Sequence, residues 1–335
     1  MIKKIDLENH FYPMSSVEAL RGREGKGDYP YWSNEDNCIH WVDGVKMTHE
    51  KLEAKLVDIA EKRIPEMEKL GIEKAVISSA PGIDILPAAE SVEVCRKSND
   101  ALYELTQRFP DRLIGSVVLP MFDTDAAVYE LERCVKDLGF KMWQTHSNYN
   151  GANPDEKRFW PIWQKLDELG IFAYLHPTIN PANTKFNDYG YPLAAAGLGF
   201  TVDCMGGIMR IMVSGMLDEI PTLKIVLGHF GEALPFLFER LDNRFYQLPE
   251  PKQHMELKPS DYFGRNIMVT TSGNASIPAF ECTRATVGMD NILLGTDHPF
   301  ESMTECIEFL DSCPMSKEDR EKLYWKNAEK LGLYL

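Results

Sequence analysis

Five polar residues of this chain could do chemistry, and each one ends a short apolar run: Glu8, His10, His176, His229 and Asp297. Their contexts are Asp-Leu-Glu-Asn-His, Tyr-Leu-His-Pro, Leu-Gly-His-Phe-Gly-Glu and Leu-Gly-Thr-Asp-His-Pro. In each context the apolar run predicts a buried strand, and a turn is predicted shortly after the polar residue. Four such units at this spacing indicate ligands that converge on one metal ion at the mouth of a (β/α)8 barrel.

The predicted ligand set mixes carboxylate oxygens with imidazole nitrogens. Such a set suits Zn, Mn, Fe or Co, and it lacks the thiolates typical of structural zinc. Glu8 and His10 alternate on one face of an extended strand, so both can point into the barrel mouth. Each residue alone also has an ordinary explanation as a solvated strand end, a satisfied structural histidine or a turn former. A strand-end lysine that could bridge two metals is not evident, which favours a single ion.

A second group of polar residues follows the remaining strands. His229 is either a further ligand or a proton-transfer group, and Glu232, one turn later, could orient its imidazole. Arg240 lies on the following helix, where a solvated or salt-bridged helix face is the alternative. His146 and Ser272 end two further strands and are expected to face the mouth. No GxSxG nucleophile elbow occurs in the sequence.

The elements that must position these residues alternate between strand and helix. We expect strands at 3–8, 74–79, 113–119, 140–145, 171–175, 223–227, 266–271 and 291–295. We expect helices at 49–70 (capped by Thr48), 88–109, from Asp123 or Thr124 to 139, 158–169, 199–219 and 232–247, with two more at the end. Eight apolar strands alternating with helices predict a parallel (β/α)8 TIM barrel. A doubly wound sheet is the alternative, but GxGxxG is absent after the first strand.

Residues 11–47 are an insertion after the first strand, within one predicted barrel domain that covers 1–335. The segment is far longer than the usual loop of about two to six residues between strand and helix. It is irregular in pattern and rich in aromatic residues, among them Trp32 and Trp41. It is either a surface excursion or a lid whose rings wall the pocket, and its position after Glu8 and His10 favours the lid.

The bulk properties exclude several classes of partner. The chain has 335 residues and a formal net charge of -15, which argues against nucleic acid or an anionic membrane as the main partner. Seven dispersed cysteines without a CxxC pair indicate a reducing cytoplasm. We see no signal peptide and no run of about 18 apolar residues that would span a bilayer.

The chain resembles the amidohydrolase superfamily, and within it the decarboxylase branch that includes γ-resorcylate, 2,3-dihydroxybenzoate, 5-carboxyvanillate and aminocarboxymuconate-semialdehyde decarboxylases. The resemblance runs from Asp-Leu-Glu8-Asn-His10-Phe to Asn-Ala-Glu-Lys-Leu331, and Leu-Gly-His229-Phe-Gly-Glu232-Ala-Leu-Pro is its most specific part. The first motif is Glu-Asn-His instead of the superfamily's usual His-x-His. The resemblance differs at His298, where relatives more often have Tyr, and at His146.

The resemblance implies one divalent ion, Zn2+ or Mn2+, held by Glu8, His10, His176 and Asp297. It implies that Asp297 also delivers a proton, that His229 with Glu232 assists, and that the reaction is non-oxidative decarboxylation of a hydroxylated aromatic or related unsaturated acid. It also implies that Arg240 contacts the substrate across the interface of a homodimer or homotetramer. His146, Ser272 and Trp32 are further expected substrate contacts, because of their positions at strand ends and in the insertion. The alternatives are a mononuclear hydrolase or hydratase acting on a lactone, amide or unsaturated acid, and a non-enzymatic barrel that keeps its metal.

Overall fold

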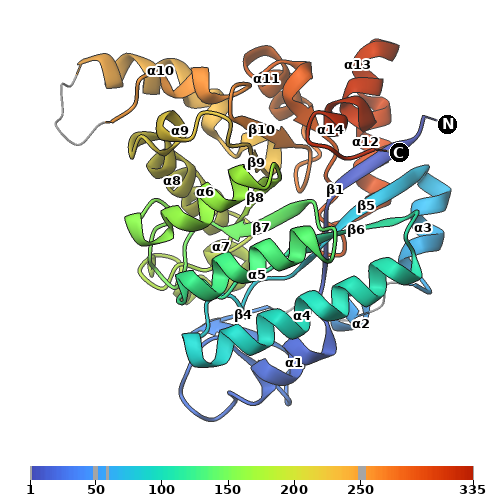
Figure 1. Cartoon of the computed structure of the whole chain (residues 1–335). Helices are drawn as coiled ribbons and strands as arrows, with labels where there is room; N and C mark the ends of the chain where they lie inside the picture. Colours follow the sequence, from blue (N-terminus) through green and yellow to red (C-terminus); the bar gives the residue numbers. More distant parts are fainter. Residues whose placement is uncertain (1, 48–51, 58–59, 248–253, 335) are drawn as a thin grey trace.

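The chain forms a barrel of eight parallel strands surrounded by helices, as a computed structural model shows (Figure 1). The structure describes residues 2–47, 52–57, 60–247 and 254–334. The barrel strands, in their order around the sheet, are β1 (Lys4–Phe11), β5 (Ile72–Ser79), β6 (Leu113–Val117), β7 (Met142–His146), β8 (Phe172–His176), β9 (Ile225–Leu227), β10 (Ile267–Thr270) and β11 (Ile292–Leu293). The backbone N–H of Leu7 in β1 donates to the carbonyl of Leu294, the residue directly after β11, and this bond joins the first strand to the end of the last one. The predicted (β/α)8 barrel is confirmed.

The helices fill the connections between the strands. They are α1 (Met14–Arg21), α2 (Leu52–Val57), α3 (Arg63–Leu70), α4 (Ala88–Arg108), α5 (Thr124–Lys136), α6 (Trp160–Glu168), α7 (Tyr191–Ala194), α8 (Gly199–Val213), α9 (Met216–Glu219), α10 (Leu234–Gln247), α11 (Ile277–Thr286), α12 (Met303–Ser312), α13 (Lys317–Glu321) and α14 (Asn327–Glu329). Asp123 caps α5 by accepting from the N–H of Ala126 at 3.0 Å, as its position before the helix predicts.

Two apolar layers hold the barrel together. Inside it, alternate residues of the strands form one buried cluster, which includes Leu7, Met142, Tyr174 and Met268. A larger cluster lies between the strands and the surrounding helices. The alternation means that the last inward-facing residue of each strand meets the others at the carboxyl end, where the sites of such barrels lie.

The insertion after β1 is more ordered than its irregular sequence predicts. β1 continues to Phe11, and α1 and a three-stranded antiparallel sheet follow: β2 (Tyr31–Ser33), β3 (Cys38–Val42) and β4 (Val45–Lys46). The strands are short and separated by Gly and charged residues, so their alternation is too brief to detect in the sequence. Figure 1 places this sheet and α1 below the barrel, against α4.

Two predicted helices are interrupted. The helix expected at 49–70 is described as α2 and α3, and Thr48, its expected cap, lies outside the described residues. The helix expected at 199–219 is divided into α8 and α9 at Gly215, whose φ of 80° is left-handed. A left-handed glycine ends a helix readily, because it has no Cβ to clash.

One described segment, Tyr191–Val213, meets the length and composition of a membrane span, which corrects the expectation that none does. It is divided between α7 and α8. Ile208, Ile211 and Met212 of α8 are fully buried within the protein. Of its most apolar 18-residue window 33% is buried within the protein, and a single segment of this kind is weak evidence for a membrane span.

Candidate active site

Four of the five strand-end residues meet at one point in the barrel mouth. Glu8 and His10 come from β1, His176 ends β8, and Asp297 follows β11. One ligand atom from each lies within 4.8 Å of every other, and all four residues are buried. The convergence predicted from their positions along the chain is therefore present in the fold.

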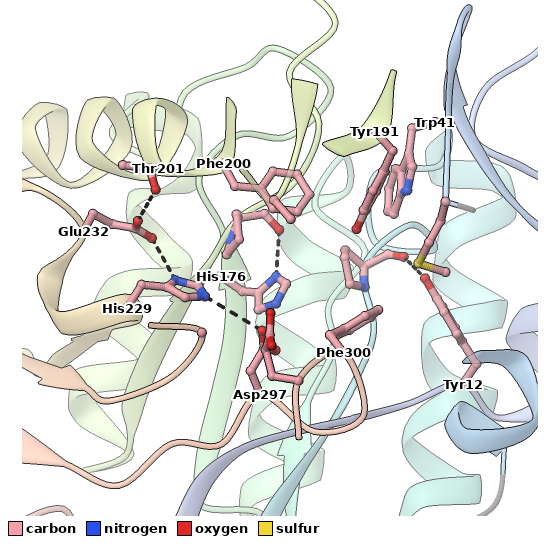
Figure 2. A pocket seen from close by; sticks show the side chains of 16 residues that line it. Tyr12, Trp41, His176, Tyr191, Phe200, Thr201, His229, Glu232, Asp297 and Phe300 are labelled. Carbon is pink, nitrogen blue, oxygen red and sulfur yellow. Dashed lines mark hydrogen bonds and ion pairs between the residues drawn. The ribbon is translucent and has the colours of Figure 1, made fainter. Parts of the chain in front are cut away.

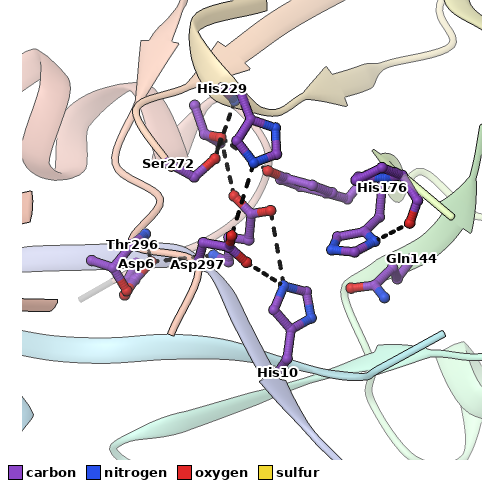
Figure 3. Close-up of polar contacts among 12 residues, drawn as sticks. Asp6, His10, Gln144, His176, His229, Ser272, Thr296 and Asp297 are labelled. Carbon is purple, nitrogen blue, oxygen red and sulfur yellow. Dashed lines mark hydrogen bonds and ion pairs between the residues drawn. The ribbon is translucent and has the colours of Figure 1, made fainter. Parts of the chain in front are cut away.

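A hydrogen bond to the next residue sets the direction of the His176 imidazole. Its Nδ1 lies 2.7 Å from the carbonyl oxygen of Pro177, so Nδ1 must carry the hydrogen and Nε2 keeps its lone pair (Figures 2 and 3). Burial, followed by the charges of His10 and His146, lowers the pKa of His176 well below its ordinary value. A neutral imidazole with one directed lone pair is the form that binds a metal.

The remaining three residues fit a divalent cation. Glu8 Oε1, His10 Nε2 and Asp297 Oδ1 are buried and make no hydrogen bond to the described residues, although His10 Nε2 lies 3.1 Å from Asp297 Oδ1. Buried polar atoms are rarely left without partners, because their desolvation is costly. Two carboxylates with two neutral imidazoles would also balance the charge of one divalent ion. The donor set is the mixed oxygen and nitrogen type that Mn2+ or Zn2+ accepts.

Asp6 fastens β1 to the loop that carries Asp297. Its carboxylate accepts from the backbone N–H of Thr296 at 3.0 Å and from the Thr296 hydroxyl at 2.5 Å (Figure 3). Burial raises the pKa of Asp6 to about 6, against the opposing effect of these hydrogen bonds. The two strands at the barrel seam, and the ligands on them, are thereby held together.

His229 stands on a left-handed turn. Residues 229, 230, 231 and 232 have φ values of 54°, 56°, 78° and 58°, and three of them are not glycine. Ser272 accepts from the His229 N–H at 3.1 Å, and Thr283 donates to the Phe230 carbonyl at 3.0 Å. Such backbone is costly and is retained where the surroundings impose it, often at functional sites.

The His229 side chain belongs to a chain of polar contacts. Nδ1 lies 3.0 Å from Glu232 Oε1, whose other oxygen accepts from Thr201 at 2.7 Å, and Nε2 lies 3.8 Å from Asp297 Oδ2 (Figure 2). Burial alone would lower the pKa of His229, but the charge of Glu232 and contacts with Asp297 raise it well above its ordinary value. Burial alone would raise the pKa of Asp297, but contacts with His10 and His229 lower it. These opposite shifts favour a proton on His229 and an ionised Asp297.

A pocket of about 310 Å³ opens beside these residues. Many of its lining residues are aromatic, and its polar lining consists of His176, Thr201, His229, Glu232, Asp297 and Glu301. The rings around it come from distant parts of the chain: Tyr12, Trp41, Tyr191, Phe200 and Phe300 (Figure 2). The described residues that line it include no lysine or arginine. Its shape and lining suit a small planar molecule with polar atoms on one edge.

The sequence of this chain matches the model of a known protein family. A model described as Amidohydrolase matches residues 5–331. The chain belongs to the amidohydrolase family. The matched stretch includes all but the first residue of the barrel strands and all four residues of the candidate metal site, so the site lies on the family's own scaffold.

Proteins similar to this amidohydrolase are named decarboxylases. The gamma-resorcylate decarboxylase of Polaromonas sp. is 34% identical over 342 residues, with 98% of each protein covered. The 2,6-dihydroxybenzoate decarboxylase from Rhizobium has a TM-score of 0.85 at 30% identity, covering 99% of this chain and 98% of the other. The 5-carboxyvanillate decarboxylase from Novosphingobium aromaticivorans, complexed with manganese and 4-hydroxy-3-methoxy-5-nitrobenzoic acid, has a TM-score of 0.88 at 28% identity, covering 98% and 96%. These similarities favour the decarboxylase prediction over the hydrolase or hydratase alternative.

The predicted substrate contacts of the amidohydrolase lie at different distances from the pocket. His146 is buried, with Nδ1 2.6 Å from Asp84 Oδ2 and its ring against that of His176, but it does not line the cavity. Ser272 is also buried and supports the His229 backbone. Trp32 lies one layer out, with its ring against Tyr12, while Trp41 lines the cavity. Arg240 is exposed on α10, away from the cavity lining of its own chain.

Several residues of the site went unnoticed in the sequence. Tyr12 and Phe300 follow the ligand motifs by two and three residues, a signal that would have found both. Tyr191, Phe200 and Thr201 arrive from the segment after β8, where aromatic and hydroxyl residues have no distinctive spacing. Only the folded chain brings them to the pocket.

Proposed function

We propose that this amidohydrolase is a metal-dependent, non-oxidative decarboxylase of a hydroxylated aromatic acid or a related unsaturated acid. The observation that carries this proposal is the meeting of Glu8, His10, His176 and Asp297 beside a pocket walled by aromatic rings. The names of the similar proteins support the reaction type.

The carboxylates of Glu8 and Asp297 and the imidazoles of His10 and His176 would hold one divalent ion per chain, Mn2+ or Zn2+. The manganese in a similar structure supports Mn2+. When bound, such an ion acts as a Lewis acid and a template for the substrate carboxylate and its neighbouring hydroxyl oxygen. The aromatic rings of the pocket would stack on the substrate ring and fix its plane.

We assign proton delivery to Asp297 and His229, which both line the pocket. The proton passes to the ring carbon that bears the carboxylate. The bond from this carbon to the carboxylate then breaks, and its electron pair returns to the ring as CO2 leaves. Each turnover consumes one proton and releases one CO2. His229 holds the proton beforehand, and Asp297, 3.8 Å away, carries it to the ring.

Glu232 supports this transfer by orienting the imidazole, and Thr201 in turn holds Glu232.

We propose that the insertion at 11–47 acts as a lid, because its Trp41 and Met47 line the pocket. A closed, partly dry pocket strengthens the electrostatic interactions on which the proton transfer depends. Substrate contacts by His146, Ser272 and Trp32 stay predictions, and each would require the substrate to reach past the present cavity wall.

We also propose a homodimer or homotetramer in which Arg240 reaches a neighbouring chain's pocket. Arg240 is exposed one turn after Phe236, whose exposed fraction is 80%, on the same face of α10. An exposed apolar ring beside a cation is typical of an interface. Such an arginine would supply the cation that the described pocket lining lacks.

Seven free cysteines support a reducing, cytoplasmic location.

Product analysis tests the reaction type. The Mn2+-loaded enzyme is incubated with a panel of hydroxylated benzoic acids and, separately, with lactones, amides and unsaturated acids. We expect loss of CO2 from at least one hydroxybenzoate. Addition of water to a lactone, amide or unsaturated acid, with no CO2 from any member of the panel, would assign the site to a hydrolase or hydratase instead.

A further inference from the structure

A buried arginine touches the backbone of the candidate ligand His10. Arg63 stands at the start of α3, outside the barrel, and its exposed fraction is 1%. Its Nη2 donates to the carbonyl oxygen of His10 at 2.5 Å. A charged side chain is costly to bury, so a guanidinium in this position must be held by strong hydrogen bonds such as this one.

The other side of His10 is also fastened. Its backbone N–H donates at 2.7 Å to the carbonyl oxygen of His298, which directly follows Asp297. Both peptide groups that flank the His10 Cα are therefore fixed, one to the loop of another candidate ligand and one to α3. The imidazole itself packs against the Phe300 ring, with 5.2 Å between centroids. No hydrogen bond at Nδ1 orients this imidazole, because that atom is buried without a partner among the described residues, and Nε2 faces Asp297 Oδ1 at 3.1 Å.

These contacts indicate that Arg63 helps to orient the His10 imidazole through the backbone of His10. His176 is oriented through its own Nδ1, whereas the direction of His10 depends on its backbone and on ring packing. We propose that Arg63 is a positioning residue for the metal site: it holds the His10 carbonyl so that the imidazole Nε2 points at the ion. This proposal rests on the proposed metal-dependent function.

A second cavity, of about 320 Å³, adjoins the buried Arg63 and allows a direct test. Arg63 lines it together with Lys55, Glu66 and His298. Phe300 lines both this cavity and the main pocket, and so stands between them. A small cation that enters from this side would reach the position of the Arg63 side chain without passing the substrate pocket.

The experiment is chemical rescue, with Mn2+ affinity as the readout. In Arg63→Ala, we expect Mn2+ to bind roughly 10- to 100-fold more weakly, as when a contact that orients a metal ligand is removed. The affinity is measured without substrate, from the free Mn2+ signal in electron paramagnetic resonance. Guanidinium chloride at low, non-denaturing concentration should recover part of this affinity, and sodium chloride at equal ionic strength should not.

Lys55→Ala is the matched control, since Lys55 is a cation on the same cavity whose described contacts do not include His10; we expect wild-type affinity. Arg63→Lys carries the test if Arg63→Ala does not fold, with an intermediate affinity expected from its single donor group. Wild-type Mn2+ affinity in the Arg63 variants, or an equal loss in Lys55→Ala, would overturn the proposal. Because turnover is not measured, a chain that decarboxylates no acid but loses Mn2+ with Arg63 would contradict only the proposed reaction.

Discussion

His229 keeps its place through an unusual backbone. Three residues other than glycine adopt positive φ in the turn from 229 to 232, at a cost of roughly 1–2 kcal/mol each. The contacts of Ser272 with the His229 N–H and of Thr283 with the Phe230 carbonyl help to offset this cost. The turn sets the imidazole between Glu232 and Asp297, which a right-handed continuation into α10 would not do. Nothing in the sequence predicts it, because Phe and Glu rarely adopt this conformation.

A substitution at Gly273 tests whether activity depends on the exact position of the His229 imidazole. A Cβ at this position would lie 2.5 Å from His229 Cδ2, so we expect Gly273→Ala to displace the ring and lower kcat by roughly 10-fold or more. Its φ of 62° adds backbone strain of about 1 kcal/mol. Gly288→Ala is the control, because Gly288 has a similar φ of 80° but nothing within 4 Å of an added Cβ. An equal loss of kcat in the two variants would show that backbone strain, and not displacement of His229, causes the loss.

The roles of His229 and the ligands can be separated by metal content. His229→Gln should lower kcat roughly 10²- to 10⁴-fold, the usual contribution of proton transfer, while the protein retains one Mn2+ per chain. His10→Gln should lose most of the metal as well as the activity. Metal analysis of the purified variants gives the answer. Loss of the ion from His229→Gln would make His229 a ligand and contradict the division of roles.

At the scale of elements, the pattern of strands and their polar ends predicted the barrel and the meeting of four residues. This succeeds because parallel strands bring their carboxyl ends together whatever the loops do. The small sheet of the insertion was not predicted, because β2, β3 and β4 are too short to show an alternation of apolar and polar residues. Arg63 was missed because an arginine in a helix ordinarily faces solvent, and only the folded position of α3 beside β5 reveals its contact with His10.

The insertion also offers a comparison between two tryptophans. Trp41 lines the pocket, whereas Trp32 is 1% exposed and packs behind Tyr12. We expect Trp41→Ala to raise KM by roughly 10-fold, since a stacking wall is lost. Trp32→Ala should mainly lower the free energy of unfolding, by about 3–5 kcal/mol. Steady-state kinetics and chemical denaturation measure both effects, and a raised KM only in Trp32→Ala would contradict this placement of the lid.

For the whole molecule, the metal should contribute to stability as well as to chemistry. Two buried carboxylates that lie this close together repel each other, and an ion that binds only the folded chain would stabilise it. At 100 times its dissociation constant, Mn2+ would add about 2.7 kcal/mol to the free energy of unfolding. Thermal unfolding should therefore shift down by several degrees after chelation and return when Mn2+ is added. An unchanged Tm in the chelated protein would show that the four residues hold no ion.

The release of labelled CO2 tests the central claim most directly. Wild-type enzyme, first chelated and then reloaded with Mn2+, is mixed with 2,6-dihydroxybenzoate that carries ¹³C in its carboxyl group, and the gas is analysed by mass spectrometry. We expect ¹³CO2 and resorcinol in equal amounts from the reloaded enzyme and neither product from the chelated enzyme. Release of ¹³CO2 that does not depend on the metal would contradict the proposed function, as would no release from this acid or any other hydroxybenzoate labelled in the same way.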